Sequence, residues 1–328
     1  MKSRADEAVA MASEILGRPV DRVERLVASS VRAIRLHSGG ETVIAARRQD
    51  EGRAKLETMV LEALARHGAH VPRPIARRGN WVFQEDLPGE RLSVALWTED
   101  GDRTALLGSA LTSLARISEA GRRAGLAGRL PVIGAEAAWR RRLTAMPDRL
   151  ASVTGLAVPA FDRTRAAIRL KPRETTLVKW DARPANAMVA QDGAVAWFDW
   201  EHCGCRDPLD DAAWLLGDEF VPDAGDGDLL ERAVELGLGG EDAETARAYL
   251  VNMGVLHMSV RLALILAKRT SRDGWRDWDT VLRLDKVGST APAFRRTARR
   301  AAFWAAESRH LAPLAPWFRD LADWAADE

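Results

Sequence analysis

The first part of the chain alternates short apolar runs with turn signals, a pattern that predicts β-strands around one helix. Residues 27–36 and 42–48 are predicted strands, and Ser38-Gly39-Gly40 supplies the turn between them. Residues 50–67 carry apolar side chains at helical spacing, and residues 81–84 form another short strand. This segment therefore predicts a compact α+β unit.

Beyond Gly89 the pattern becomes mostly helical. Helical spacing is clear over residues 104–124, and residues 135–150 and 162–170 are shorter helix candidates. A β interruption at residues 175–199 precedes further helices, which run from Pro208 onward. We expect an α+β fold with two lobes. Residues 1–88 form a small lobe with an N-terminal helix, an antiparallel sheet and one further helix, and residues 89–328 form a large helical lobe.

Charge and composition narrow the class of protein. The 328 residues carry a formal net charge of +1, so no overall field favours nucleic acid or an anionic membrane. Cys203 and Cys205 are too close in sequence to pair readily with each other, which fits a reducing compartment, and we expect a cytoplasmic location. Residues 1–17 predict an amphipathic helix instead of a secretory signal. Polar residues interrupt the apolar stretch at 249–267, which favours a buried helix over a membrane span.

The segment with the most chemical information runs from Thr176 to Asp199. An apolar strand leads to Asp181, and Asn186 follows five residues later. Two short apolar runs then flank Asp192-Gly193, a strong hairpin signal, and the second run ends on Asp199. The hairpin is expected to bring Asn186 and Asp199 close together.

This arrangement suits phosphoryl transfer. The reaction needs a carboxylate that orients and deprotonates the attacking hydroxyl, and oxygen ligands that hold Mg²⁺ on nucleotide phosphates. Because Mg²⁺ keeps several waters, one carboxylate and one amide oxygen are a sufficient protein contribution. Asp181 is the candidate base, and Asn186 and Asp199 are the candidate metal ligands. Taken singly, each residue is better explained as a loop residue or a strand-end cap, but the ordered set of three with its hairpin favours the catalytic interpretation.

The segment resembles the aminoglycoside phosphotransferase and choline kinase family, relatives of the protein kinases. The family motif His-Gly-Asp-x-x-Pro-x-Asn is matched at Asp181, Pro184 and Asn186, and Ile-Asp-Trp-Glu is matched at residues 198–201. Residues 204–211 resemble the Gly-x-x-Asp-Pro-x-x-Asp that follows. The resemblance covers roughly residues 25–220. It implies a bilobal protein-kinase-like fold, with Asp181 as catalytic base and Asn186 and Asp199 as Mg²⁺ ligands. It also implies architectural roles for Asp207 and Asp211.

The same resemblance implies a nucleotide site in the small lobe. Glu57 stands where the family has a helix glutamate, and Arg47 stands near the position of the strand lysine that this glutamate pairs with. Gln84, Glu85, Asp86 and Leu87 resemble the hinge whose backbone faces the adenine. The implied cofactors are ATP or GTP, with Mg²⁺.

Three departures from the family pattern stand out. Lys179-Trp180 replaces His-Gly, the phosphate-covering loop at residues 28–35 has no glycine, and the strand lysine is absent. Lys179 is a candidate for a phosphate contact or for an ion pair with Asp181. These features leave three functions open: a small-molecule kinase acting on an aminoglycoside-, sugar- or choline-like metabolite, a nucleotide- or ligand-binding module, and a nucleotidyl transferase. Trp180 and Trp200 are candidates for the wall of an acceptor pocket.

Overall fold

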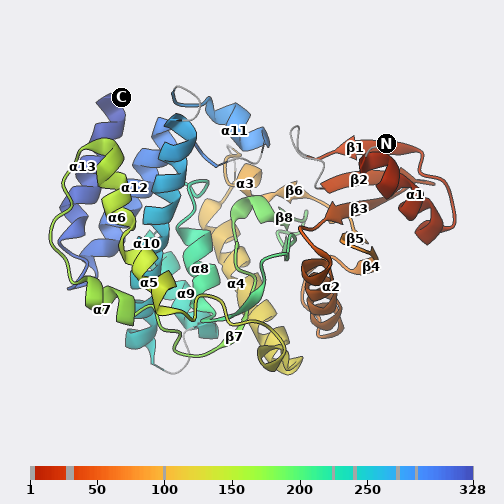
Figure 1. The fold of residues 1–328 in the computed structure, drawn as a ribbon, viewed down its shortest axis with the longest axis horizontal. Helices are drawn as coiled ribbons and strands as arrows, with labels where there is room; N and C mark the ends of the chain where they lie inside the picture. Colours follow the sequence, from red (N-terminus) through yellow and green to blue (C-terminus); the bar gives the residue numbers. More distant parts are fainter. Residues whose placement is uncertain are drawn as a thin grey trace.

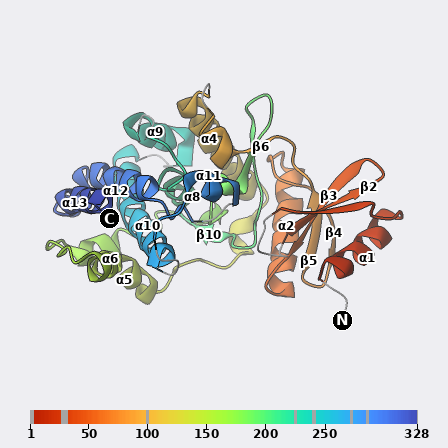
Figure 2. The same cartoon turned by 90° about the horizontal axis from the view of Figure 1, so that it is seen from above.

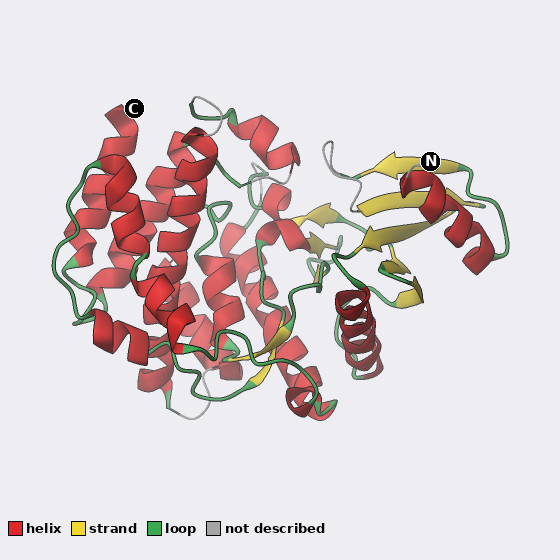
Figure 3. Ribbon diagram, viewed as in Figure 1, coloured by secondary structure: helices red, strands yellow, loops and turns green. Residues whose placement is uncertain are grey.

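A computed structural model describes residues 4–26, 33–98, 101–223, 226–238, 242–270, 274–284 and 287–327 of the chain. A sheet-rich N-terminal part stands beside a larger helical part (Figures 1 and 3), which confirms the expected α+β fold. The five strands of the N-terminal sheet all lie between residues 22 and 85, and β6 (Glu90–Arg91) already pairs with β8 (Ala187–Val189) of the helical part. A division of the chain at residue 88 remains our interpretation.

The N-terminal sheet is antiparallel, with strand order β1-β2-β3-β5-β4. Its strands are β1 (Arg22–Arg25), β2 (Ala33–Ser38), β3 (Glu41–Arg47), β4 (Pro74–Arg78) and β5 (Trp81–Glu85). β3 and β5 fit the predicted strands closely. Of the strand predicted for residues 27–36, residues 27–32 lie outside the described residues, and β2 continues two residues past the predicted end. The sequence did not reveal the charged strand β1 or the edge strand β4, which begins at a proline.

Two helices lie on opposite sides of this sheet (Figure 2). Ala8 and Ala12 of α1 (Arg4–Leu16) pack with the alternate strand residues Ile34, Leu36, Val43, Ala45, Trp81 and Phe83. α2 (Glu51–Arg66) lies on the side of the helical part, and the Asp50 side chain caps its first turn by accepting the Arg53 N–H at 2.8 Å. We call the face formed by these six strand residues the α1 face. The residues that alternate with them along the strands therefore point toward the second lobe.

The helical part is built around α10, with short β elements on the side of the cleft. Its elements, in chain order, are α3 (Leu92–Ala95), α4 (Arg103–Arg123), η1 (Leu126–Gly128), α5 (Ala137–Thr144), α6 (Met146–Thr154), α7 (Arg163–Ile168), β7 (Thr176–Val178), η2 (Pro184–Asn186), β8, β9 (Val195–Trp197), β10 (Gly204–Arg206), α8 (Leu209–Leu216), α9 (Asp226–Ala233), η3 (Val234–Leu238), α10 (Ala243–Thr270), α11 (Trp278–Leu284), α12 (Ala291–Ala306) and α13 (Leu314–Asp327). The single helix predicted for residues 135–150 is wrong. α5 ends at Thr144, and Pro147 favours a new helix start, that of α6.

α10 is long and apolar enough to cross a membrane by length and composition, but 78% of its most apolar window is buried inside the protein. It packs against α6, α8 and α12. The close approach to α12 depends on Gly254, because a side chain there would overlap the indole of Trp304. The expectation of a buried core helix is therefore supported by its contacts, and His257 on the same helix is 3% exposed.

The predicted hairpin forms as expected. β8 and β9 pair in antiparallel register, with Ala187 opposite Trp197, and the turn places Gly193 at φ +79°. The Asp192 carboxylate accepts the Ala194 N–H at 3.0 Å and tightens this turn. Together with β6, the hairpin forms a small sheet on the side of the helical part that faces the N-terminal sheet (Figure 1).

Candidate active site between the two lobes

A cavity of about 340 Å³ lies between the N-terminal sheet and the hairpin. Its sheet side is formed by Ala33, Ile44 and Ala46, which share the face opposite α1. Met188 and Phe198 of the hairpin segment form the apolar opposite side. A cavity between two lobes with apolar side chains on its facing walls is a suitable site for the base of a nucleotide.

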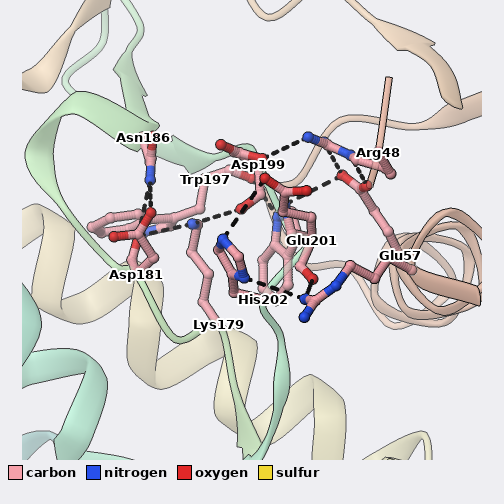
Figure 4. A network of polar contacts seen from close by, with 11 residues as sticks. Arg48, Glu57, Lys179, Asp181, Asn186, Trp197, Asp199, Glu201 and His202 are labelled. Carbon is pink, nitrogen blue, oxygen red and sulfur yellow. Dashed lines mark hydrogen bonds and ion pairs between the residues drawn. The ribbon is translucent and has the colours of Figure 1, made fainter. Parts of the chain in front are cut away.

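The hairpin places two oxygen-bearing side chains at the edge of this cavity, as the sequence predicted. Asn186 and Asp199 both line it. The segments that carry them are joined directly, because the Phe198 N–H donates to the Asn186 carbonyl at 3.0 Å. The amide nitrogen of Asn186 donates to the Asp181 carboxylate at 2.8 Å and to the Asp181 carbonyl at 3.1 Å (Figure 4). Asp181 therefore lies beside Asn186, although it is not among the residues that line the cavity itself.

The backbone is strained at this site. Among the described residues, only Trp180, Asp181 and Asp199 are non-glycine residues with positive φ, at +53°, +88° and +60°. Left-handed conformations cost side-chain-bearing residues free energy and persist where the surrounding structure imposes them. Two of the three are the predicted base and a predicted metal ligand.

Lys179 imposes part of this geometry. Its side chain is fully buried, and its ammonium donates to the carbonyls of both Asp181 and Asp199 at 3.0 Å. Burial lowers the pKa of Lys179, although the carboxylates of Asp181, Asp199 and Asp211 oppose this shift. The prediction of a phosphate contact or an Asp181 carboxylate ion pair is therefore wrong for this structure. The ammonium is taken up by main-chain oxygens in the interior.

Asp211 holds the same turn from the other side. Its two carboxylate oxygens accept the N–H groups of Lys179 at 2.6 Å and of Trp180 at 2.8 Å. Asp207 accepts the Leu209 N–H at the start of α8 and forms an ion pair with Arg173. The architectural roles expected for Asp207 and Asp211 agree with these contacts.

The end of β3 turns Arg48 toward the cavity, and the sequence-based choice of Arg47 is not supported. Arg47 ends β3 and pairs with Trp81, and it does not line the cavity. Arg48 follows Ala46 by two residues and so lies on the cleft face, 6% exposed. Because side chains alternate along a strand, an error of one residue moved the predicted cation to the wrong face.

Arg48 links the two lobes (Figure 4). Its Nε and Nη2 contact both carboxylate oxygens of Glu57 on α2, and its Nη1 donates to Asp199 Oδ1 at 2.7 Å. Glu57, which the sequence predicted, also accepts the Trp200 N–H at 3.2 Å. Burial alone would lower the pKa of Arg48, but the charges of Asp199 and Glu57 raise it above its usual value.

Asp199 is held in its ionised form by the same contacts. Burial alone would raise the pKa of this carboxyl, but Arg48 and Lys179 outweigh that effect and lower the pKa. The fully buried carboxyl of Glu57 has a raised pKa because burial outweighs the opposing effect of Arg48. Of these two carboxylates, Asp199, which faces the cavity, is thus the better prepared to bind a cation.

The predicted hinge residues Gln84, Glu85, Asp86 and Leu87 all line the cavity. The carboxylate of Asp86 is engaged by Arg35, with Nε to Oδ2 at 2.6 Å and Nη2 to Oδ1 at 3.1 Å. The sequence analysis did not single out Arg35 or the side chain of Gln84. Arg35 and Gln84 alternate along their strands with the apolar residues that pack against α1. This alternation is the signal that places their side chains on the cavity side of the sheet.

Comparison with known proteins agrees with this geometry. The sequence model of the phosphotransferase enzyme family matches residues 27–251, about two thirds of the chain. The chain belongs to the phosphotransferase enzyme family. No curated protein matches the chain.

Solved structures related to this family share the fold. A choline/ethanolamine kinase family protein from Mesorhizobium loti is 14% identical, with 96% of this chain and 99% of that chain covered and a TM-score of 0.57. A macrolide 2'-phosphotransferase from Brachybacterium faecium is 18% identical, with 80% and 93% covered and a TM-score of 0.54. An amicoumacin kinase in complex with AMP-PNP, Ca²⁺ and its antibiotic is 15% identical, with 88% and 95% covered and a TM-score of 0.52. These likenesses confirm the bilobal protein-kinase-like fold.

The donor set of this family member suits a hard divalent cation. The Asn186 amide nitrogen is used by Asp181, which leaves its oxygen as the group available to a cation. The other oxygen donor at this edge is the ionised Asp199 carboxylate. Among the described residues, His, Cys, Asp and Glu form no cluster of three or more that suits a metal ion. A small set of oxygen donors is the arrangement that Mg²⁺ uses on nucleotide phosphates.

Proposed function

We propose that this chain transfers the γ-phosphoryl group of a purine nucleoside triphosphate, ATP or GTP, to a hydroxyl group of a small molecule. The observation that carries the proposal is the direct contact of Asp181 with Asn186, at the edge of a cavity that Asn186 and Asp199 both line. This places a candidate base beside the two candidate ligands of nucleotide-bound Mg²⁺.

Each residue has a distinct part in the proposed reaction. Asp181 orients the acceptor hydroxyl and takes its proton while the oxygen forms a bond to the γ-phosphorus and the bond to the leaving nucleoside diphosphate breaks. Asn186 and Asp199 would hold Mg²⁺, which supplies neutralising charge to the phosphates when bound. Arg48, fixed by Glu57, brings a permanent positive charge to the same side of the cleft.

An assay of nucleotide consumption tests this proposal. The protein is expected to convert ATP or GTP to the diphosphate in the presence of Mg²⁺ and an acceptor. Asp181→Asn is expected to lose about 1,000-fold or more in kcat while a thermal-shift measurement still shows binding of the Mg-nucleotide. Asp192→Asn in the hairpin turn is a matched control that should keep its activity. Full activity of Asp181→Asn would contradict the proposed base.

A binding module without catalysis is the second candidate, favoured by one observation. In this structure the guanidinium of Arg48 contacts Asp199, the residue proposed to hold the metal. The two candidates differ in a simple measurement, since a binding module shifts its unfolding temperature with nucleotide but forms no product. Phosphorus NMR of the product also distinguishes phosphoryl transfer from nucleotidyl transfer, which would release pyrophosphate.

The acceptor is proposed to be a neutral or anionic hydroxyl compound, because the carboxylates near the base are already used internally. All five carboxylates between residues 207 and 219 are buried: Asp207, Asp210, Asp211, Asp218 and Glu219. A polycationic acceptor needs carboxylates that can turn toward it.

The internal partners of these carboxylates are specific. Asp218 accepts from Arg183 at 2.8 Å, and Glu219 accepts from Arg261 and from the Gly288 N–H. Asp210 is paired with Arg206 and accepts the Tyr249 hydroxyl at 2.7 Å. Trp180 is half-buried and packs between Trp139 and Trp214, so an aromatic surface adjoins Asp181, whereas Trp200 is fully buried.

A matched series of sugars tests the acceptor class. The 4-methylumbelliferyl glycosides of glucose, glucuronic acid and glucosamine share a flat aromatic group and differ in charge. Phosphorylation of the neutral or anionic compound, with at least tenfold lower kcat/KM for the glucosamine compound, is expected. Preferred phosphorylation of the cationic compound, or of an aminoglycoside such as kanamycin, would overturn this part of the proposal.

A further inference from the structure

The side chain of Gln84 is a buried polar group without an internal partner. It lines the cavity between the lobes, is 3% exposed, and follows Phe83 of the α1 face on the opposite side of β5. Within the described part of the chain, its carboxamide oxygen has no hydrogen-bond partner. Buried amide oxygens are nearly always paired, so an unpaired one in a cavity needs an explanation.

The neighbours of Gln84 cannot supply the missing donor. Its cross-strand partners are Ile44 and Pro74, and Ala46 lies further along the same face of β3. Across the cavity lie Met188 and Phe198, whose side chains have no N–H or O–H group. The guanidinium of Arg35, which also lines the cavity, donates to Asp86 and Glu24. The unpaired amide of Gln84 is therefore available for a specifying contact with a ligand.

We propose that the carboxamide oxygen of Gln84 accepts a hydrogen bond from the exocyclic amine of adenine, and so makes the protein select ATP over GTP. This inference rests on the proposed function, which requires a purine nucleotide in the same cavity. Adenine carries an amino group on the ring edge where guanine carries a carbonyl oxygen. With guanine, two acceptors would face one another and neither would be satisfied.

The position of Gln84 in the fold agrees with a contact to the base. It directly precedes the hinge residues Glu85, Asp86 and Leu87, which line the same cavity. Arg48, by contrast, lies beyond Ala46 and contacts Asp199 at the phosphate side of the proposed site. Along β5 and β3 the chain thus offers Gln84 before the fixed charge pair of Arg48 and Asp199, in the order in which a nucleotide presents its base and phosphates.

Calorimetric titration with three Mg-nucleotides tests the inference: ATP, GTP, and purine riboside triphosphate, which lacks the exocyclic amine. The native protein is expected to bind ATP about tenfold more tightly than purine riboside triphosphate, and GTP no better than the latter. In Gln84→Met the ATP and purine riboside affinities should agree within about twofold, because the acceptor is gone. Met188→Leu, which changes an apolar wall residue, should keep the native discrimination.

Three results would overturn the inference. Equal binding of ATP and purine riboside triphosphate by the native protein would show that the amine is not read. Persistence of the tenfold difference in Gln84→Met would assign it to another group, and tighter binding of GTP would show that the amide donates to a carbonyl instead. All three leave nucleotide binding intact, whereas failure to bind any of the three nucleotides would also remove the proposed function.

The unfolding temperature of Gln84→Met without nucleotide is a second readout. Since the amide oxygen has no internal partner, its replacement by methionine is expected to leave the unfolding temperature unchanged or to raise it. A large decrease would mean that the amide is needed by the fold itself, which would overturn its assignment to a ligand.

Discussion

The guanidinium of Arg48 reaches the carboxylate of Asp199 across the cleft, with 2.7 Å between Nη1 and Oδ1. The two residues are 151 positions apart in the chain and belong to different lobes. The same guanidinium is gripped by Glu57 of α2, so one side chain connects the sheet, the helix and the hairpin. One side chain therefore both joins the two lobes and brings a fixed positive charge to the cleft.

Replacement of Arg48 by methionine is expected to lower kcat/KM for the nucleotide by about 100-fold. The variant loses a fixed positive charge beside the proposed phosphate site and leaves the buried Glu57 without its ion-pair partner. Arg48→Lys keeps the charge but not the three-way fork, and is expected to keep more activity than Arg48→Met. Steady-state kinetics with varied nucleotide measure both effects.

Arg47→Met is the matched control for this prediction. It removes the same kind of side chain from the adjacent position, which does not line the cavity. Activity within about threefold of the native protein is expected. If Arg47→Met were as damaging as Arg48→Met, the assignment of the two faces of β3 would be incorrect.

Replacement of Lys179 by methionine is expected to lower kcat while the KM for nucleotide stays nearly constant. The ammonium holds the carbonyls of Asp181 and Asp199, and its loss would leave both without this donor in the interior. A decrease of about 2–4 kcal/mol in the free energy of unfolding is expected in urea titrations. Lys179→Gln, whose amide can still donate, should recover part of the kcat. Equal kcat for the native and methionine forms, measured per folded molecule, would rule out a positioning role.

Asp211→Ala is expected to shift the proposed base Asp181 from its position, although Asp211 does not contact Asp181. This change removes the acceptor of the Lys179 and Trp180 N–H groups, which should reduce the free energy of unfolding by about 2–3 kcal/mol. It should also lower kcat, since the left-handed backbone before Asp181 loses its support. Asp207→Ala is the matched control: another buried acid near the start of α8, with no bond to this turn. A loss of kcat in both variants, or in neither, would contradict the prediction.

The contribution of His257 to the stability of the protein is expected to be lost in mild acid. Burial, reinforced by the charges of Arg261 and Arg183, lowers the pKa of His257 to about 3, although Glu219 opposes the shift. Because the unfolded chain takes up this proton near pH 6.5 and the folded protein does not, the contribution is complete above pH 6.5 and is lost as the pH falls. Between pH 6.5 and pH 5 this amounts to about 2 kcal/mol.

Urea unfolding of the native protein and of His257→Gln, each at pH 7 and pH 5, measures this effect. The variant should show the smaller decrease in unfolding free energy between the two pH values, whatever its absolute stability. Buried acids such as Asp210, with a pKa raised to about 7 by burial, change stability in the opposite direction, so the comparison between the two proteins is the informative quantity. Identical decreases would show that His257 is not responsible.

Local sequence signals predicted α2 and the hairpin well. The spacing of apolar residues predicted α2, and Asp192-Gly193 predicted the turn between β8 and β9. These features depend on residues close together in the chain. The meeting of Asn186 and Asp199 followed from the hairpin for the same reason.

Contacts that depend on register or on distant segments were not predictable. The choice between Arg47 and Arg48 requires the strand register to within one residue. Because this chain lacks the family's strand lysine, the sequence has no marker for that register. The destination of the Lys179 ammonium depends on where the Asp199 segment returns, twenty residues later. β1 and β4 are short and rich in arginine or begin with proline, so their sequences lack the apolar alternation of a buried strand.

The left-handed conformation of Trp180 limits how this sequence can change. The family motif has glycine at this position, and glycine adopts φ +53° without strain. Here the indole of Trp180 packs between Trp139 and Trp214, and its backbone N–H donates to the carboxylate of Asp211. Replacing Trp180 alone by glycine would make the backbone more flexible and leave a cavity between Trp139 and Trp214. Replacing Lys179 alone by histidine would remove the ammonium that donates to the carbonyls of Asp181 and Asp199. The pair has to be exchanged together, so single substitutions toward the common motif should impair the protein before a combined set restores it.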